Sequence, residues 1–301
     1  MSKSAEVTTQ RWSWIVFLQS EFFYLLSFVL AAGITMPFLR ATADVAATSN
    51  PVTSESPGSF LVIFGVATVL AVILVKYLSD GRFWSFFFGA AAFSGLFLTI
   101  YYPLVLVFTQ TLAMVMAIIF ALIMLVGRVK SQRIWLHNLI VLLATVGVAR
   151  LFGTQFTPEA TVNILLFLAA YDIIAVYFTK HMIAMAVTLF ERQAFFGLVL
   201  TSKLKGWHGK LSDLELQNGI TVVGGGDIAF PLFFALTILI FYGSAAFWIM
   251  CAATLVGVLL MHLLAVYPKT KRPIPGLPPL VLCSLVGYSG VLWLIAHGLI
   301  G

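Results

Sequence analysis

Two acidic residues lie inside long apolar stretches of this chain. Asp172 occurs within LFLAAYDIIAVYF and Asp227 within ITVVGGGDIAFPLFF. An ionised carboxylate is costly in hydrocarbon, so an acid inside a membrane span is a candidate functional residue. Two carboxylates a few ångströms apart share one proton and titrate as a unit. One member can then take a proton from water while the other donates to a carbonyl oxygen, which is acid–base chemistry suited to peptide hydrolysis.

The composition indicates a membrane protein. The 301 residues are 61% hydrophobic and only 9% charged, and apolar runs long enough to cross a bilayer recur along the chain. We therefore predict an all-α, polytopic membrane protein that forms one integral domain over residues 1–301. Cys251 and Cys283 lie in apolar segments and are expected to be core residues rather than a disulfide.

The apolar segments predict nine transmembrane helices. They cover about residues 13–39, 60–78, 83–101, 103–126, 134–152, 159–179, 219–242, 245–266 and 277–297. Only Tyr101-Tyr102-Pro103 divides the third segment from the fourth, and only Tyr242-Gly243-Ser244 divides the seventh from the eighth. The first apolar stretch is too long for a signal-peptide core, so we expect it to remain in the mature chain.

The basic residues are distributed unevenly between the two sides that this map defines. One side has only Arg40 and Arg150. The other side has the remaining fifteen: Lys3, Arg11, Lys76, Arg82, Arg128, Lys130, Arg133, Lys180, Arg192, Lys203, Lys205, Lys210, Lys269, Lys271 and Arg272. Because basic loops stay in the cytoplasm, we predict a cytoplasmic N-terminus and an outside C-terminus. The net charge of +6 is explained by this asymmetry, so no nucleic-acid partner is expected.

Two connections are long. Residues 40–59 are small and polar and are predicted to form an extracellular loop. Residues 180–218 form the cytoplasmic connection between the sixth and seventh spans. Its first part, HMIAMAVTLFERQAFFGLVL, is apolar and predicts either an extension of the sixth span or an interfacial helix.

The two acids are expected at the same depth. Asp172 precedes the cytoplasmic Lys180 by about eight residues, and Asp227 follows Asn218 by about nine residues. At a helical rise of 1.5 Å per residue, both lie roughly 12–14 Å from the cytoplasmic helix ends. Their side chains can meet if the sixth and seventh spans pack together.

Glycines and prolines occur at the same level. Gly224-Gly225-Gly226 immediately precede Asp227; they indicate either close helix packing or room for an unwound substrate backbone. Pro231 predicts a kink in the seventh span. Four prolines between Pro273 and Pro279 open the ninth span, which fits a rigid helix start in the leaflet that holds both acids.

These residues together resemble the motifs of a known family. Tyr171-Asp172, Gly224-Gly225-Gly226-Asp227 and Pro275-Gly276-Leu277-Pro278 resemble the YD, GxGD and PALP motifs of the GxGD intramembrane aspartyl proteases. That family comprises presenilin, signal peptide peptidase and archaeal homologues, and the compact chain looks most like an archaeal presenilin homologue. One departure is Gly276, where the family usually has alanine.

The resemblance implies a function and a site. Asp172 and Asp227 would be the catalytic pair, with Tyr171, the three glycines and the Pro275–Pro278 segment shaping the site. The substrates would be transmembrane helical proteins in the lipid bilayer, and no metal or organic cofactor would be needed. The location would be the cell membrane of a prokaryote, and association into a homo-oligomer stays open.

Other functions remain as alternatives. A proton- or cation-coupled transporter or leak channel also uses intramembrane acids and broken helices, and a prepilin-type aspartyl peptidase is a third alternative. Glu21, in the first span, is expected to meet a polar neighbour or the interface rather than to take part in catalysis. The five histidines are scattered, so a zinc site is not expected.

Overall fold

The structure, a computed structural model, describes residues 14–46, 57–77, 81–178, 187–190, 192–202, 204–211, 220–266 and 274–300. Eight long helices contain most of these residues. The helices are α1 (Trp14–Ala46), α2 (Pro57–Tyr77), α3 (Gly81–Leu104), α4 (Gln110–Ser131), α5 (Ile134–Gly153), α6 (Pro158–Ile173), α8 (Gly225–Val266) and α9 (Leu277–Ala296). Two short helices, η1 (Ile174–Phe178) and η2 (Leu204–His208), and two strands, β1 (Gly197–Thr201) and β2 (Ile220–Gly224), complete the described elements.

The helices fit the predicted membrane fold. Within the described ranges, seven are long and apolar enough to cross a membrane. The longest, α8, is interrupted at Gly243, whose φ of 80° and ψ of −175° are not helical, so α8 consists of two rods. If the two parts of α8 are counted separately and α2 is included, the described part of the chain contains nine long helices. This confirms the predicted polytopic helical fold, while the sides faced by the termini stay a prediction.

Several predicted boundaries are wrong. Helix α1 continues to Ala46, well beyond the predicted end at residue 39. Helix α3 runs through Pro103 to Leu104, and α4 begins only at Gln110, because a hydrogen-bonded turn occupies residues 105–108. Helix α8 begins at Gly225 rather than at residue 219, since the preceding five residues form a strand.

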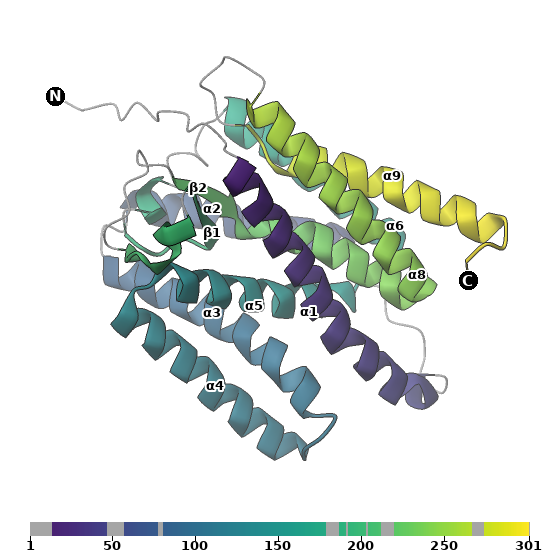
Figure 1. The fold of residues 1–301 in the computed structure, drawn as a ribbon, viewed down its shortest axis with the longest axis horizontal. Helices are drawn as coiled ribbons and strands as arrows, with labels where there is room; N and C mark the ends of the chain where they lie inside the picture. Colours follow the sequence, from purple (N-terminus) through teal and green to yellow (C-terminus); the bar gives the residue numbers. More distant parts are fainter. Residues whose placement is uncertain are drawn as a thin grey trace.

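Helix α5 is the centre of the bundle. It is the most buried of the apolar helices and contacts α1, α3 and α8 (Figure 1). Gly95 of α3 and Gly147 of α5 let these two backbones touch, because a Cβ at either position would meet the other helix. Helix α4 packs on α3 and α5 at the periphery and is the most exposed of the seven helices that are long and apolar enough to cross a membrane.

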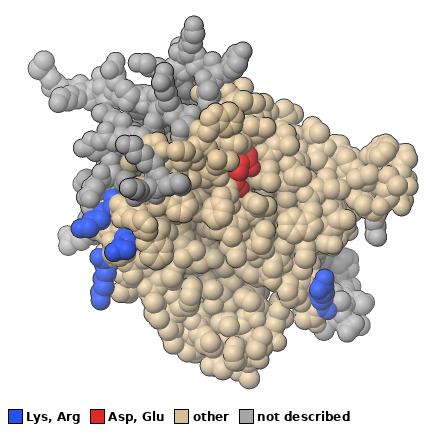
Figure 2. Space-filling model, in the orientation of Figure 1, with Lys and Arg blue, Asp and Glu red and all other residues tan. Residues whose placement is uncertain are grey.

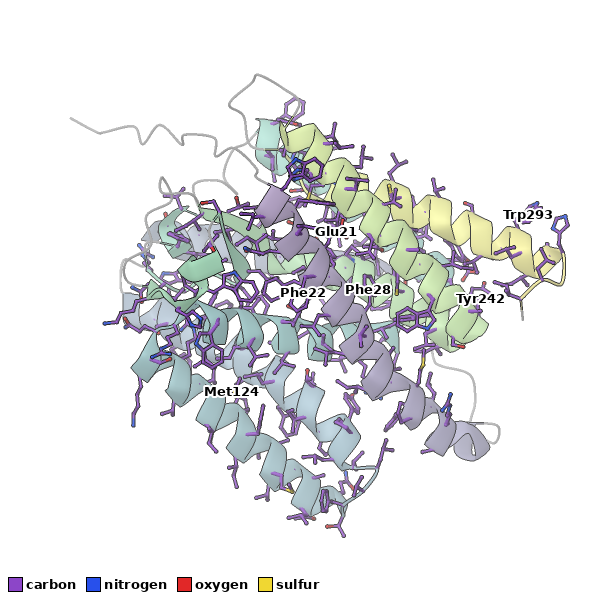
Figure 3. All side chains as sticks on the ribbon, viewed as in Figure 1. Glu21, Phe22, Phe28, Met124, Tyr242 and Trp293 are labelled. Atoms are coloured by element: carbon purple, nitrogen blue, oxygen red, sulfur yellow. The ribbon has the colours of Figure 1, made fainter. Side chains whose placement is uncertain are left out.

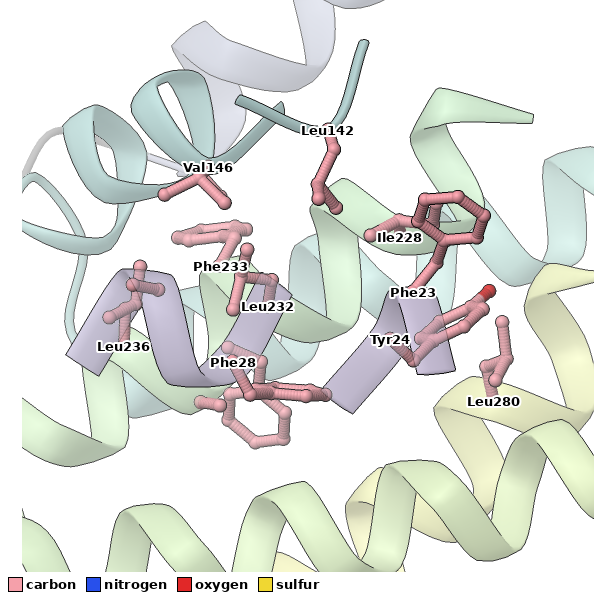
Figure 4. Close-up of a cluster of buried hydrophobic side chains, with 14 of the residues drawn as sticks. Phe23, Tyr24, Phe28, Leu142, Val146, Ile228, Leu232, Phe233, Leu236 and Leu280 are labelled. Carbon is pink, nitrogen blue, oxygen red and sulfur yellow. The ribbon is translucent and has the colours of Figure 1, made fainter. Parts of the chain in front are cut away.

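Helix α8 joins this centre to the C-terminal helix. It packs along α9 and α1, and α6 contacts both α8 and α9. The close-up in Figure 4 shows buried hydrophobic side chains of α1, α5 and α8 gathered in one cluster, Phe28, Leu232 and Phe233 among them. The Phe28 ring packs edge-on against Phe247 of α8, with ring centroids 6.0 Å apart. The helices that carry the two intramembrane acids therefore share one core with α1 and α9.

Charged side chains are sparse on the visible face. Figure 2 shows blue Lys and Arg atoms towards opposite ends of the molecule, with one red patch on a wide uncharged band. That patch lies where Figure 3 labels Glu21, on α1. A broad band with so few charged side chains suits contact with lipid chains.

The connection between α6 and α8 holds a small antiparallel sheet. Strands β1 and β2 pair in the register Gly197↔Gly224 to Thr201↔Ile220. Both predicted alternatives, an extension of the sixth span and an interfacial helix, are thus wrong for residues 197–200, which form most of β1. The sequences GLVLT and ITVVG are rich in residues that favour strands, and β1 is buried throughout. Residues 47–56 of the predicted extracellular loop lie outside the described part of the chain, as do residues 180–186, 191, 203 and 212–218 of the predicted cytoplasmic connection. The same holds for Lys3, Arg11, Lys269, Lys271, Arg272 and Pro273.

Candidate active site

Asp172 lies in the last turn of α6, immediately before η1. Its side chain is buried, with 3% of its surface exposed. The Leu277 N–H donates to its Oδ2 at 3.1 Å. Leu277 is the first residue of α9, and its N-cap, Gly276, has no side chain to serve as a cap. The Asp172 carboxyl therefore caps α9 from another helix, a position where the free amides favour an acceptor.

Asp227 lies in the first turn of α8. The prediction that helix precedes it from residue 219 is wrong, because residues 220–224 are extended. Its carboxyl packs between two glycine backbones. A Cβ on Gly224 would be 3.2 Å from Asp227 Oδ2, and a Cβ on Gly276 would be 2.9 Å from the same atom.

The two carboxyls thus approach the same dipeptide. Asp172 accepts a hydrogen bond from Leu277, and Asp227 packs against Gly276. Pro275 and Leu277 are buried around this contact, and Pro278 follows within the first turn of α9, where a missing N–H costs no helix bond. The fold therefore brings residues of all three sequence motifs close to one another.

The three glycines have different surroundings. Gly224 ends β2, and Gly225 begins α8. Gly225 donates its N–H to the Phe196 carbonyl at 2.9 Å, and a Cβ there would lie 2.6 Å from the Phe196 ring. Gly226 would place a Cβ near Phe230. Close packing explains Gly225, whereas Gly224 leaves space for the Asp227 carboxyl.

Side-chain amides seal the outer edge of β1. Asn138 of α5 donates Nδ2–H to the Val199 carbonyl and accepts the Val199 N–H at Oδ1, both at 2.8 Å. Gln19 of α1 does the same for Thr201, at 2.9 and 3.1 Å. These two amides satisfy the outer backbone groups of β1, as a neighbouring strand would, and they attach the sheet to helices α1 and α5.

A second polar cluster holds the start of β1. The His137 ring contacts the Gly197 carbonyl through Nε2 at 3.0 Å and accepts a hydrogen bond at Nδ1 from Arg128 Nε at 3.1 Å. Because Nδ1 accepts, the neutral tautomer with hydrogen on Nε2 fits both contacts. Arg128 also donates to the Gln193 carbonyl at 2.7 Å. Gly197 is paired with Gly224, so this cluster supports the strand that leads to Asp227.

Tyr24 is a residue at this site that the sequence analysis did not identify. It lies on α1 with 1% of its surface exposed, and its hydroxyl donates to the Asp227 main-chain carbonyl at 3.1 Å. Gln19 and Asn138 were missed as well. The signal that could have found all three is a polar group within an otherwise apolar span.

Two further residues of the sequence analysis, Tyr171 and Glu21, lie close to these groups in the chain. Tyr171 is half-buried beside Asp172, and its role stays a prediction. Glu21 is half-buried on α1, one turn before Tyr24. Among the residues that the structure describes, no three His, Cys, Asp or Glu side chains gather as a metal ion would require.

Comparisons with known proteins agree with this arrangement. The family described as "Signal-peptide peptidase, presenilin aspartyl protease" matches residues 22–296. No curated protein matches the chain.

Solved structures share the fold. A presenilin family intramembrane aspartate protease in a C222 crystal form superposes with a TM-score of 0.60 at 22% identity, covering 91% of this chain and 96% of that chain. A presenilin family protease in a P2 crystal form gives a TM-score of 0.63 at 24% identity, covering 92% and 97%. Because the family match extends from α1 to the end of α9, through both intramembrane acids, this chain belongs to the signal-peptide peptidase and presenilin family of aspartyl proteases.

Proposed function

We propose that Asp172 and Asp227 are the catalytic pair with which this integral membrane protease hydrolyses peptide bonds in transmembrane segments of other proteins. The observation that carries the proposal is the convergence of both carboxyls on the Gly276–Leu277 backbone. The two acids come from different helices, and α9 supplies the surface on which they meet.

The chemistry follows from one shared proton. The ionised carboxyl takes a proton from a water molecule as the water oxygen attacks the substrate carbonyl carbon, and the protonated carboxyl gives its proton to the carbonyl oxygen. Collapse of the tetrahedral intermediate breaks the C–N bond, and the amine leaves with a proton from the acid pair. The step uses only water and the two side chains.

The sheet offers a way to present the substrate. Since Asn138 occupies the Val199 N–H and C=O, the opposite residue Val222 belongs to a non-hydrogen-bonded pair and directs its own N–H and C=O away from β1. Val222 is 36% exposed. An unwound substrate segment can add to this edge as a strand, which leads its backbone towards Gly224 and Asp227.

The partners follow from the same reasoning. The substrates are transmembrane helical proteins that reach the site through the lipid bilayer, and water enters from the cytoplasmic side. A prokaryotic cell membrane is the proposed location, and self-association is left open. The alternative, a proton- or cation-coupled transporter or leak channel, finds no support in the family match or the fold.

Single substitutions of the two acids test the proposal. We expect Asp172→Asn and Asp227→Asn each to lower cleavage of a transmembrane substrate by about 10³-fold, because each removes one acid–base group. Glu21→Gln is the matched control: it neutralises another half-buried acid of the same protein and should retain the wild-type rate. Circular dichroism and thermal unfolding check that all three variants fold.

The outcomes separate the two functions. Full proteolysis by either purified aspartate variant would refute the catalytic pair. Ion flux through liposomes that contain the wild-type protein, lost in the same variants, would instead favour the transporter.

A further inference from the structure

The main chain of Asp227 has an unusual position in α8. In an α-helix the carbonyl of each residue accepts the N–H four positions later, which for Asp227 is residue 231. Residue 231 is proline, which has no N–H and whose ring crowds the carbonyl four residues before it. The Asp227 carbonyl therefore lacks its regular helix bond, in the first turn of the helix that carries the acid.

The Tyr24 hydroxyl supplies a donor to this carbonyl. It comes from α1, 203 positions earlier in the chain, and donates to the Asp227 oxygen at 3.1 Å. Helices α1 and α8 pack together over this contact. Figure 4 shows the Tyr24 ring beside Leu280 of α9, with Ile228 of α8 close by. Tyr24, Ile228 and Leu280 all belong to the buried hydrophobic core, so the contact lies where α1 packs on α8.

We propose that Tyr24 is a positioning residue of the active site, whose hydroxyl takes the place of the amide hydrogen that Pro231 lacks. The inference rests on the proposed function, because it assigns Tyr24 a role through Asp227. The hydroxyl ties the Asp227 main chain to α1, while the Asp227 carboxyl is confined between Gly224 and Gly276. The acid is thus held from both sides, by its main chain and by its side chain.

This role differs from ordinary core packing. The Tyr24 ring fills space between α1, α8 and α9, and a phenylalanine would fill nearly the same space. Only the hydroxyl meets the carbonyl. Removal of the oxygen alone therefore separates positioning from packing, and an alanine at position 231 returns the N–H that would make the hydroxyl unnecessary.

A double-mutant cycle tests the proposal. The proteins are wild type, Tyr24→Phe, Pro231→Ala and the double variant, each purified as the full chain. For each we measure kcat and KM on a transmembrane peptide substrate, together with the thermal unfolding midpoint. We expect Tyr24→Phe to lower kcat by about tenfold, the effect of one buried hydrogen bond, with KM little changed. In the double variant we expect kcat to return to within about threefold of Pro231→Ala, because the restored N–H occupies the carbonyl.

Tyr242→Phe is the matched control. Its hydroxyl meets the Tyr288 hydroxyl at 3.4 Å, near the Gly243 kink of α8 (Figure 3), and its removal should leave kcat unchanged. A wild-type kcat for Tyr24→Phe, or losses that simply multiply in the double variant, would overturn the proposal. If Tyr24→Phe unfolds, the double variant still decides: recovery of both folding and kcat supports the role at the carbonyl, and no recovery refutes it.

Failure of this inference can be told apart from failure of the proposed function. Inactive Asp172→Asn and Asp227→Asn proteins beside a fully active Tyr24→Phe protein would remove the role of Tyr24 and keep the catalytic pair. Fully active Asp172→Asn and Asp227→Asn proteins would refute both the catalytic pair and the role of Tyr24.

Discussion

Gly276→Ala tests how closely the Asp227 carboxyl is held. An added Cβ would lie 2.9 Å from Asp227 Oδ2, 3.0 Å from Cγ and 3.2 Å from Oδ1. All three separations are shorter than an ordinary contact, so the carboxyl has to recede by about 0.5 Å. The backbone at Gly276, with φ −82° and ψ −36°, suits alanine equally well. The substitution therefore strains the Asp227 side chain, the proposed catalytic group, and not the fold.

We expect Gly276→Ala to lower kcat without lowering the stability of the fold. A displacement of about 1 Å can lower a rate by about 10²-fold, so about 0.5 Å corresponds to roughly tenfold in kcat. Alanine also reduces the freedom of the unfolded chain, which adds about 0.4–1 kcal/mol of stability where the backbone is compatible. The measurements are kcat and KM on a transmembrane peptide and the thermal unfolding midpoint.

Gly290→Ala is the matched control for this prediction. It makes the same change on the same helix, α9, but a Cβ there meets nothing within 4 Å, so kcat should not change. The comparison matters because the PALP motif that Pro275–Pro278 resembles has alanine in place of Gly276. A wild-type kcat in Gly276→Ala would refute the reasoning, since it would mean that the Asp227 carboxyl moves without cost to catalysis.

Two other predictions concern the sheet and the shared proton. Asn138→Ala should lower the free energy of unfolding by about 2–4 kcal/mol, because it leaves the buried Val199 N–H and C=O unpaired. Thermal unfolding and amide exchange in β1 measure this loss. The control is Asn163→Ala, which changes an exposed asparagine and should have no effect on stability. The plot of kcat/KM against pH should be bell-shaped, because activity needs a single proton on the pair Asp172 and Asp227. A value of kcat/KM that stays constant from acid to alkaline pH would contradict a shared proton.

The two acids could be identified from the sequence because of where they occur. A carboxylate inside an apolar run is expensive, so Asp172 and Asp227 stand out without any structure. The prolines from Pro275 to Pro278 predict a helix start, and α9 begins at Leu277. In both cases the local sequence carries the signal, because cost in hydrocarbon and the missing proline N–H are properties of single residues.

The sheet could not be identified in the same way. The segments 197–201 and 220–224 are short apolar runs, and such runs are compatible with a strand or a buried helix. Their state depends on partners: each strand pairs with the other, and Asn138 and Gln19 satisfy the outer edge of β1. For this reason the start of α8, and the depth of Asp227 within it, were predicted wrongly.

The amino-acid sequence by itself determined the class of the protein, the approximate helices and the two acids, because hydrophobic length and the cost of a buried charge act locally along the chain. The tertiary structure alone decided which groups surround those acids. Leu277 donates its N–H to Asp172, Gly276 packs on Asp227, and the Tyr24 hydroxyl donates to the Asp227 carbonyl. These contacts join residues far apart in sequence, so only the packing of α1, α6, α8 and α9 could bring them together.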